Sequence, residues 1–111
     1  MNLENWLESE LGAQMSTVRR KVIVSGRVQG VAFRYYTRDV ALSNGVYGWV
    51  RNLPDGRVEA VFEGKQEDVD TVVKWCRKGP PASQVENVQI EDQRATGEFD
   101  NFEIRFSGSL F

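Results

Sequence analysis

The amino-acid sequence predicts an α+β fold in which two helices cover one face of a mainly antiparallel sheet. Three observations predict it. A chain of 111 residues with 41% apolar content suits one domain with a single core. Segments with strand-like alternation and segments with helical spacing follow one another in the order strand, helix, strand, strand, helix, strand, before a last strand expected at an edge. Glycine, proline and asparagine stand at the junctions between these segments.

The first half of the predicted domain holds one strand, a tight loop and one helix. The strand is predicted over residues 19–26, where β-branched residues precede a glycine, and the loop over residues 27–32. The helix is predicted over residues 34–43 and ends at Asn44 and Gly45, which adopt the left-handed conformation readily. Its buried face is expected to consist of Phe33, Tyr36, Thr37, Val40, Ala41 and Asn44.

A hairpin and a second helix follow. Strands are predicted over residues 46–53 and 57–62, and Pro54-Asp55-Gly56 forms the turn between them. The second helix begins near residue 67, where acidic side chains favour a helix start, and ends at the break Gly79-Pro80-Pro81. Its apolar stripe is expected to consist of Val69, Val72, Val73 and Cys76.

Two strands complete the predicted sheet. They are expected over residues 85–90 and 102–106, with a polar loop over residues 93–100 between them. In the last strand Phe102, Ile104 and Phe106 alternate with charged residues and are expected to point inward. The resulting order of elements is that of a ferredoxin-like sandwich, βαββαβ, with an extra C-terminal edge strand.

Residues 1–18 are interpreted as an N-terminal extension and residues 19–111 as the domain. Trp6, Leu7 and Leu11 have spacings that suit one stripe of a short amphipathic helix. Met15 is the alternative natural start, in which case residues 1–14 are an upstream extension. No chemistry is expected in this segment under either interpretation.

The composition excludes several kinds of chemistry. The chain has no histidine, which removes the commonest general base, the commonest zinc ligand and any phosphohistidine intermediate. The single cysteine, Cys76, permits no internal disulfide and no zinc cluster of the Cys-plus-His type. Its place on an apolar helical stripe predicts a buried, inert thiol rather than a nucleophile. We expect neither a metal nor another cofactor.

The charge and hydropathy of the chain bear on its partners. A net charge of -2 and a pI near 5.2 give no global attraction for nucleic acid. No apolar run approaches the roughly 20 residues that span a bilayer, and the first 18 residues lack the pattern of a secretory signal. We therefore expect a cytoplasmic protein that binds neither nucleic acid nor a membrane. A monomer is expected, with a dimer paired through an exposed edge strand as the alternative.

The segment Gly26–Arg34 lies between a predicted strand end and a predicted helix start. Free backbone amides and the helix dipole attract an anion at such a position, and two glycines allow the backbone to curl around it. The guanidinium of Arg34 can close the same pocket with two parallel hydrogen bonds to phosphate oxygens. The alternative is a plain tight turn with Arg34 in solvent.

The segment Gly48–Gly56 delivers Asn52 just before a proline turn. A neutral carboxamide offers both a donor and an acceptor, so it can orient an attacking water without bringing negative charge to a phosphate site. The alternative role of Asn52 is that of a turn former whose side chain bonds its own backbone.

These two segments together resemble a known family. Gly26–Arg34 is similar to the acylphosphatase signature, and Gly48–Gly56 is similar to the second signature of that family. The likeness extends over residues 19–106, about four-fifths of the chain, and includes the Gly-Pro-Pro break and the closing stretch Asn101–Arg105. The resemblance implies a stand-alone acylphosphatase with the ferredoxin-like fold, which converts an acyl phosphate to a carboxylate and inorganic phosphate.

By the same resemblance, Arg34 and Asn52 are the catalytic residues. The backbone amides expected to bind the phosphate are those of Val28, Gln29, Gly30, Val31, Ala32 and Phe33. The reaction expected is in-line attack by a water that Asn52 orients, with no metal and no covalent intermediate.

Two alternatives stand beside this interpretation. One is a non-catalytic anion- or RNA-binding module of the same fold, in which Tyr47, Trp49 and Phe62 stack bases, although the strand over 57–62 alternates acidic with apolar residues. The other is a domain of a larger carbamoyl-transfer or hydrogenase-maturation protein, which would continue into Cys-rich zinc segments. The acyl group of the substrate is not specified by any motif.

Overall fold

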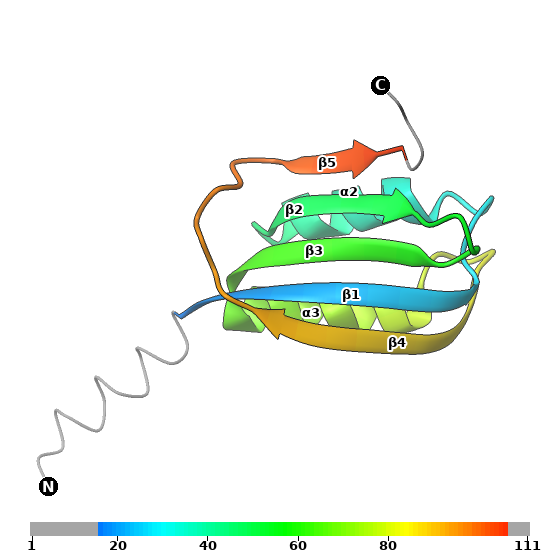
Figure 1. Ribbon diagram of the computed structural model, residues 1–111, viewed down its shortest axis with the longest axis horizontal. Helices are drawn as coiled ribbons and strands as arrows, with labels where there is room; N and C mark the ends of the chain where they lie inside the picture. Colours follow the sequence, from blue (N-terminus) through cyan, green and yellow to red (C-terminus); the bar gives the residue numbers. More distant parts are fainter. Residues whose placement is uncertain (1–15, 107–111) are drawn as a thin grey trace, which may run out of the picture.

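The computed structural model describes residues 16–106 and shows the predicted order of elements (Figure 1). The elements are β1 (Thr17–Arg27), α2 (Phe33–Ser43), β2 (Tyr47–Asn52), β3 (Val58–Lys65), α3 (Gln66–Lys78), β4 (Gln84–Gln93) and β5 (Phe102–Arg105). β1 begins at Thr17, two residues before the start that we expected for the domain. The helix or extension predicted over residues 1–14 lies outside the described residues.

The sheet has the strand order β4-β1-β3-β2-β5. β1 pairs with β3 and β4, and β2 pairs with β3, all in antiparallel register. β5 lies at the edge of the sheet, as expected for the extra strand, and it pairs with β2 in parallel register, which was not predicted. The mainly antiparallel ferredoxin-like sandwich predicted from the sequence is thereby confirmed.

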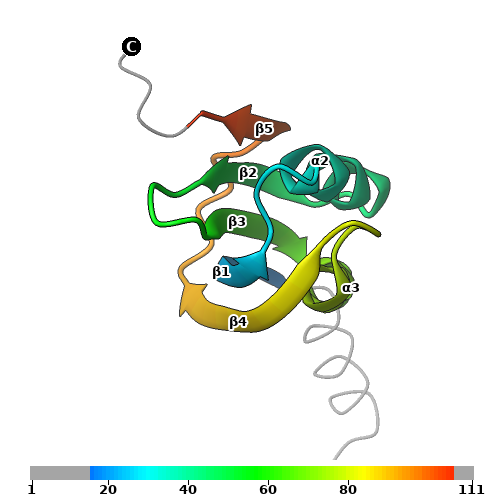
Figure 2. The same ribbon diagram turned by 90° about the vertical axis from the view of Figure 1, so that its right-hand side faces the viewer.

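Both helices cover the same face of the sheet (Figure 2). The core between them is built mainly from valines, whose branched side chains suit the pleated surface of a strand. Two aromatic pairs complete it: the ring centroids of Phe33 and Trp75 are 5.5 Å apart, and those of Phe62 and Phe102 are 5.7 Å apart. Because Phe33 is the first residue of α2, this packing fixes the helix start next to the end of β1.

Two side chains predicted to be inward are exposed. Tyr36 is 47% exposed, because the buried stripe of α2 runs through Phe33, Thr37 and Ala41 at intervals of one turn and Tyr36 lies beside it. Phe106 is 61% exposed, because β5 ends at Arg105 and the alternation of side chains ends with it. Both predictions were wrong.

A polar segment leads from β4 to β5 along one end of the sheet, opposite the end where β1 runs into α2 (Figure 1). The carboxylate of Glu63 accepts hydrogen bonds from the backbone amides of Thr96 and Gly97, both at 2.9 Å. Arg19 forms an ion pair with Glu98, and its guanidinium lies 4.9 Å from the ring centroid of Phe99. These contacts hold the segment against the sheet and so bring β5 to its edge position.

No helix within residues 16–106 is long and apolar enough to cross a membrane.

Candidate active site

The predicted site segments meet at one end of the molecule, where the loop after β1, the start of α2 and the β2–β3 turn lie together (Figures 1 and 2). A pocket of about 280 Å³ opens there. It is lined by Val28, Gly30, Ala32, Phe33, Arg34, Tyr35 and Asn52. The two side chains that we singled out, Arg34 and Asn52, therefore share one cavity although they are 18 residues apart in sequence.

The loop between β1 and α2 curls through two left-handed residues. Gly30 has φ 74°, and Ala32, at the N-cap of α2, has φ 60°. Val31 between them has negative φ, since Ala32 is the one described non-glycine residue with positive φ. Alternation of this kind turns successive amides to the same concave side, which is the arrangement of an anion-binding nest.

The amides of this loop are available for a ligand. Within the described part of the chain, residues 28–33 donate no backbone hydrogen bond. The first turn of α2 contains no acidic residue, so nothing in that turn offsets the positive end of the helix dipole. The loop and helix start together provide the electrostatic conditions in which an anion is favoured.

Arg34 is the second residue of α2, and its side chain reaches the end of β5. Its Nη1 donates a long hydrogen bond of 3.5 Å to the carbonyl oxygen of Arg105, and its guanidinium lies 5.0 Å from the ring centroid of Phe106. It takes part in none of the ion pairs found within residues 16–106. A guanidinium at a pocket can pair with an anionic ligand when no carboxylate of the described residues is bound to it.

Asn52 is the last residue of β2 and is paired with Val58 across the hairpin. Its Oδ1 is buried and has no hydrogen-bond partner among the described residues. A buried acceptor left unpaired costs about 1–3 kcal/mol, so it is expected to bind a water or a ligand group. This atom is the one buried polar side-chain atom in the described chain that is left in this state.

The structure adds features that the sequence did not indicate. Tyr35 lines the pocket while remaining exposed to solvent, and the guanidinium of Arg38 lies 5.7 Å from its ring centroid. Gln29 and Val31, although part of the predicted loop, do not contribute to the pocket lining. The Gln29 side chain instead reaches the β2–β3 hairpin. No local sequence pattern encodes contacts of this kind, because they depend on how distant segments meet.

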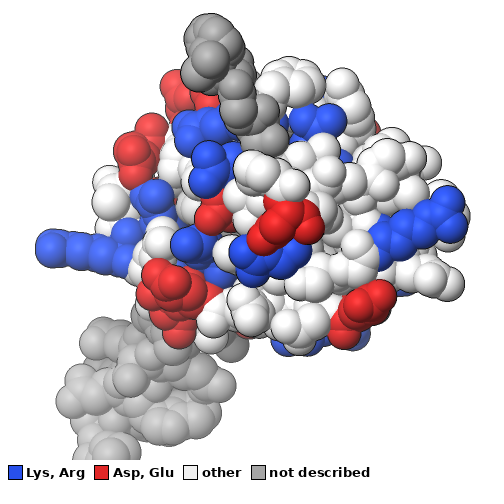
Figure 3. Space-filling view, turned by 45° about the vertical axis from the view of Figure 1, so that its right-hand side comes forward, with Lys and Arg blue, Asp and Glu red and all other residues white. Residues whose placement is uncertain are grey.

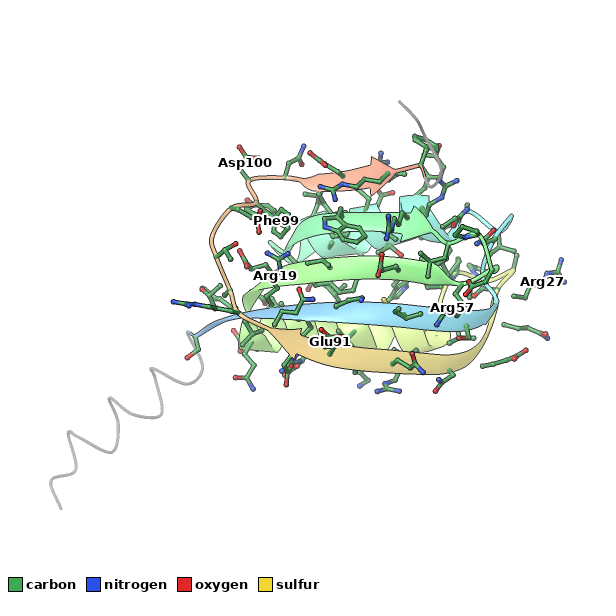
Figure 4. The ribbon with its side chains drawn as sticks, in the orientation of Figure 1. Arg19, Arg27, Arg57, Glu91, Phe99 and Asp100 are labelled. Carbon is green, nitrogen blue, oxygen red and sulfur yellow. The ribbon has the colours of Figure 1, made fainter. Side chains whose placement is uncertain are left out.

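Charge around the site is mixed rather than uniformly basic. Arg27 belongs to the motif but extends away from the body of the protein (Figure 4). Arg57, on the hairpin, is paired with Asp55 at 2.8 Å. Figure 3 shows basic and acidic side chains interspersed over this side of the molecule. The loop amides and Arg34, rather than a broad basic surface, are therefore the groups at this pocket that favour an anion.

Other candidate groups do not form a second site of comparable character. A hollow of about 230 Å³ over β1 and β4 is lined by Lys21, Ile23, Gln89, Ile90 and Glu91, and its lysine is 3.4 Å from Glu59. No group of three or more potential metal-binding side chains occurs within residues 16–106. Cys76 is buried among core residues, and burial raises the pKa of its thiol to about 12, so the thiol is protonated at neutral pH.

The fold and the pocket define a small α+β protein with a nest of backbone amides beside an arginine and an amide side chain. Comparisons with known proteins agree. The family model described as acylphosphatase matches residues 20–104. A protein named acylphosphatase from Pelotomaculum thermopropionicum is 59% identical over 92 residues, which cover 83% of this chain and 100% of that protein.

Solved structures give the same result. An acylphosphatase from Coxiella burnetii superimposes with a TM-score of 0.77 at 36% identity, covering 80% of this chain and 93% of that one. Full-length HypF has a TM-score of 0.72 at 22% identity over 86% of this chain and 13% of its own, which shows the shared fold alone. The chain belongs to the acylphosphatase family.

Proposed function

We propose that this protein hydrolyses the carboxyl–phosphate bond of acyl phosphates by direct attack of water on phosphorus. The reaction is RCO–OPO₃²⁻ + H₂O → RCOO⁻ + H₂PO₄⁻, in which the bond between phosphorus and the acyl oxygen breaks as water bonds to phosphorus. The family assignment supports the activity. The observation that carries the mechanism is the buried Oδ1 of Asn52, which has no hydrogen-bond partner within residues 16–106. Asn52 lines the same pocket as Arg34 and the loop residues Val28, Gly30, Ala32 and Phe33.

The nest and Arg34 hold the phosphoryl group in this proposal. The positive φ values of Gly30 and Ala32 support a loop whose amides of residues 28–33 turn toward the bound phosphoryl group, and the guanidinium of Arg34, which lines the same pocket, supplies a full positive charge. In the loose transition state of phosphoryl transfer, negative charge is distributed over the three equatorial oxygens of the phosphoryl group. Preorganised donors therefore stabilise the transition state, and the removal of one such donor costs about 3–4 kcal/mol.

Asn52 orients the nucleophile. Its Oδ1 accepts a hydrogen bond from a water molecule, which directs a lone pair of the water oxygen toward phosphorus, in line with the departing carboxylate. The carboxylate is a good leaving group, so a strong base is not required, and the proton of the water passes to a phosphoryl oxygen. The absence of histidine agrees with this route. Positioning of all the reacting groups together removes about 7–11 kcal/mol of barrier, and the hydrogen bond that Asn52 accepts from the water supplies one part of it.

Measurement of phosphate release distinguishes the role of Asn52 from the role of Arg34. With benzoyl phosphate as substrate and p-nitrophenyl phosphate as a phosphomonoester control, we expect rapid release from the former only. Asn52→Ala is expected to lower kcat by about 10²–10³ while inhibition by inorganic phosphate is retained, because the water is lost and the anion pocket is not. Arg34→Ala is expected to weaken phosphate inhibition and raise KM. Wild-type turnover in both variants would contradict the assigned roles.

One observation favours a second candidate, RNA binding on the open face of the sheet. The guanidinium groups of Arg51 and Arg105 lie 5.4 Å and 4.8 Å from the ring centroid of Trp49. However, Arg51 is paired with Glu59 at 2.7 Å and Arg105 with Glu103 at 3.4 Å, which neutralises the cations. A fluorescence titration with single-stranded RNA tests this candidate, and tight, salt-sensitive binding without acyl phosphate hydrolysis would replace the proposed function.

A further inference from the structure

The side chain of Gln29 joins the anion-binding loop to the hairpin that follows Asn52. Its Nε2 donates to the carbonyl oxygen of Leu53 at 2.8 Å and to that of Arg57 at 2.9 Å. A primary amide has two protons, so each carbonyl receives one. The two acceptors are 24 and 28 residues away in sequence, so these bonds connect segments that the chain itself does not hold together.

The two carbonyls belong to the closing pair of the hairpin. The Leu53 amide donates to the Arg57 carbonyl oxygen at 2.8 Å, and the Asp55 carboxylate accepts from the Arg57 amide at 3.1 Å. Leu53 directly follows Asn52, so the position of the closing pair determines where the Asn52 side chain enters the pocket. Gln29 thus contacts the hairpin at the point that fixes Asn52 relative to the loop.

The anion-binding loop and the β2–β3 hairpin differ in how firmly the rest of the fold holds them. The loop lies between Val28 and Phe33, which are 1% and 2% exposed in the core. The hairpin tip, Pro54 to Gly56, is exposed to solvent. Loss of the Gln29 bonds therefore frees the hairpin rather than the loop, because buried apolar contacts still hold the loop at both ends.

We propose that Gln29 is a positioning residue that holds Asn52 in register with the bound phosphoryl group. This inference rests on the proposed function and assigns the Gln29 side chain a role apart from its backbone amide. It acts through Asn52 and the attacking water, so its loss lowers the rate of the chemical step and leaves the binding of the anion intact. A misplacement of about 1 Å costs on the order of a hundredfold in rate.

The test is a double-mutant cycle with Gln29→Met and Asn52→Ala. Met has a similar length but no donor. Gln29→Met is expected to lower kcat ten- to a hundredfold, on the order of the cost of a small misplacement, with KM and inhibition by inorganic phosphate unchanged. The double variant is expected to be no slower than Asn52→Ala alone, because Gln29 acts only through Asn52. If Gln29 only stabilised the fold, Gln29→Met would lower kcat by the same factor in the wild type and in Asn52→Ala.

Three further variants complete the design. Gln29→Asn keeps the amide but shortens the side chain by one bond of about 1.5 Å, so it cannot reach both carbonyls and is expected to lower kcat even if the Met variant does not fold. Gln29→Lys restores donors to both carbonyls and is expected to recover part of the rate. Gln89→Met, on the exposed surface of β4, is the matched control and is expected to retain wild-type kinetics.

The outcomes distinguish the inference from the function on which it rests. Wild-type kcat in Gln29→Asn and Gln29→Met, multiplicative losses in the double variant, or weakened phosphate inhibition in place of a lower kcat would each overturn the role of Gln29. A wild-type kcat in Asn52→Ala would instead overturn the proposed mechanism. The melting temperature of every variant is measured, so that a lower kcat can be distinguished from a loss of folded protein.

Discussion

Arg34 and Phe106 are in contact across the junction between the start of α2 and the end of β5. The guanidinium carbon of Arg34 lies 5.0 Å from the centroid of the Phe106 ring, while Nη1 of the same side chain donates to the Arg105 carbonyl oxygen. The parallel edge strand therefore does more than widen the sheet. Its last residue, Arg105, and the following Phe106 contact Arg34, the one arginine among the residues that line the pocket.

The first prediction concerns this contact. A cation–π interaction at an exposed site contributes about 0.5–1 kcal/mol, so Phe106→Ala is expected to raise KM and the phosphate inhibition constant about two- to fivefold, with little change in kcat. Phe106→Tyr keeps the ring and serves as the control. Steady-state kinetics on benzoyl phosphate measure the effect. If Phe106→Ala matches the wild type while Arg34→Ala does not, the ring has no part in holding the guanidinium.

The second prediction concerns Gly48, which has φ 147° and lies against the backbone of β3. A Cβ at this position would overlap the carbonyl oxygen of Val61, and the amide of Gly48 also bonds the carbonyl oxygen of Asn101 before β5. Gly48→Ala is expected to lower the free energy of unfolding by about 2–5 kcal/mol, since it adds both backbone strain and overpacking.

Gly97→Ala is the matched control for Gly48→Ala. Gly97 has φ 73° with open space around it, so only the strain of the left-handed conformation applies, about 1–2 kcal/mol. Urea denaturation gives both values. Equal losses in the two variants would show that the contact with Val61 relaxes without cost.

The third prediction concerns the pH dependence of stability through Cys76. Burial raises the pKa of this thiol from its ordinary value of 9.0 to about 12. Between these values the unfolded chain has lost the thiol proton and the folded chain retains it, so unfolding releases a proton. The contribution is constant below about pH 9 and is lost by about 1.4 kcal/mol per pH unit as pH rises toward 12.

Comparison of the wild type with Cys76→Ala isolates this contribution from lysines and tyrosines that titrate in the same range. The difference between their free energies of unfolding is expected to shrink steadily above about pH 9. At neutral pH, iodoacetamide is expected to leave Cys76 unmodified in the folded protein, because both access and the thiolate are missing. Rapid alkylation under native conditions would contradict the buried position.

The sequence predicted the elements well because their patterns are local. Helical spacing over Val69, Val72, Val73 and Cys76 identified the buried stripe of α3, and all four residues are buried. Patterns fail where an element ends, since the alternation through Phe102 and Ile104 says nothing about a residue beyond the last paired position. Phe106 was misplaced for that reason.

The site was predictable only in part, for a related reason. The two motifs indicated the residues that now line one pocket, but their roles stay predictions until they are tested. The bonds of Gln29 to the hairpin join residues more than twenty positions apart. Glu63, 5% exposed, was also not identified as buried, because the segment that covers it runs from β4 at one edge of the sheet to β5 at the other edge. Such contacts follow from topology, which no short window of sequence contains.

The left-handed turns at Gly30 and Ala32 have a consequence for how this protein can vary. Every residue except proline offers the same main-chain N–H, whatever its side chain. Selection on the nest therefore acts on its backbone conformation. Side chains that point away from the nest can change without altering the amides that it presents to a ligand. A survey of natural variants should find the positions that bend the chain fixed and those between them free.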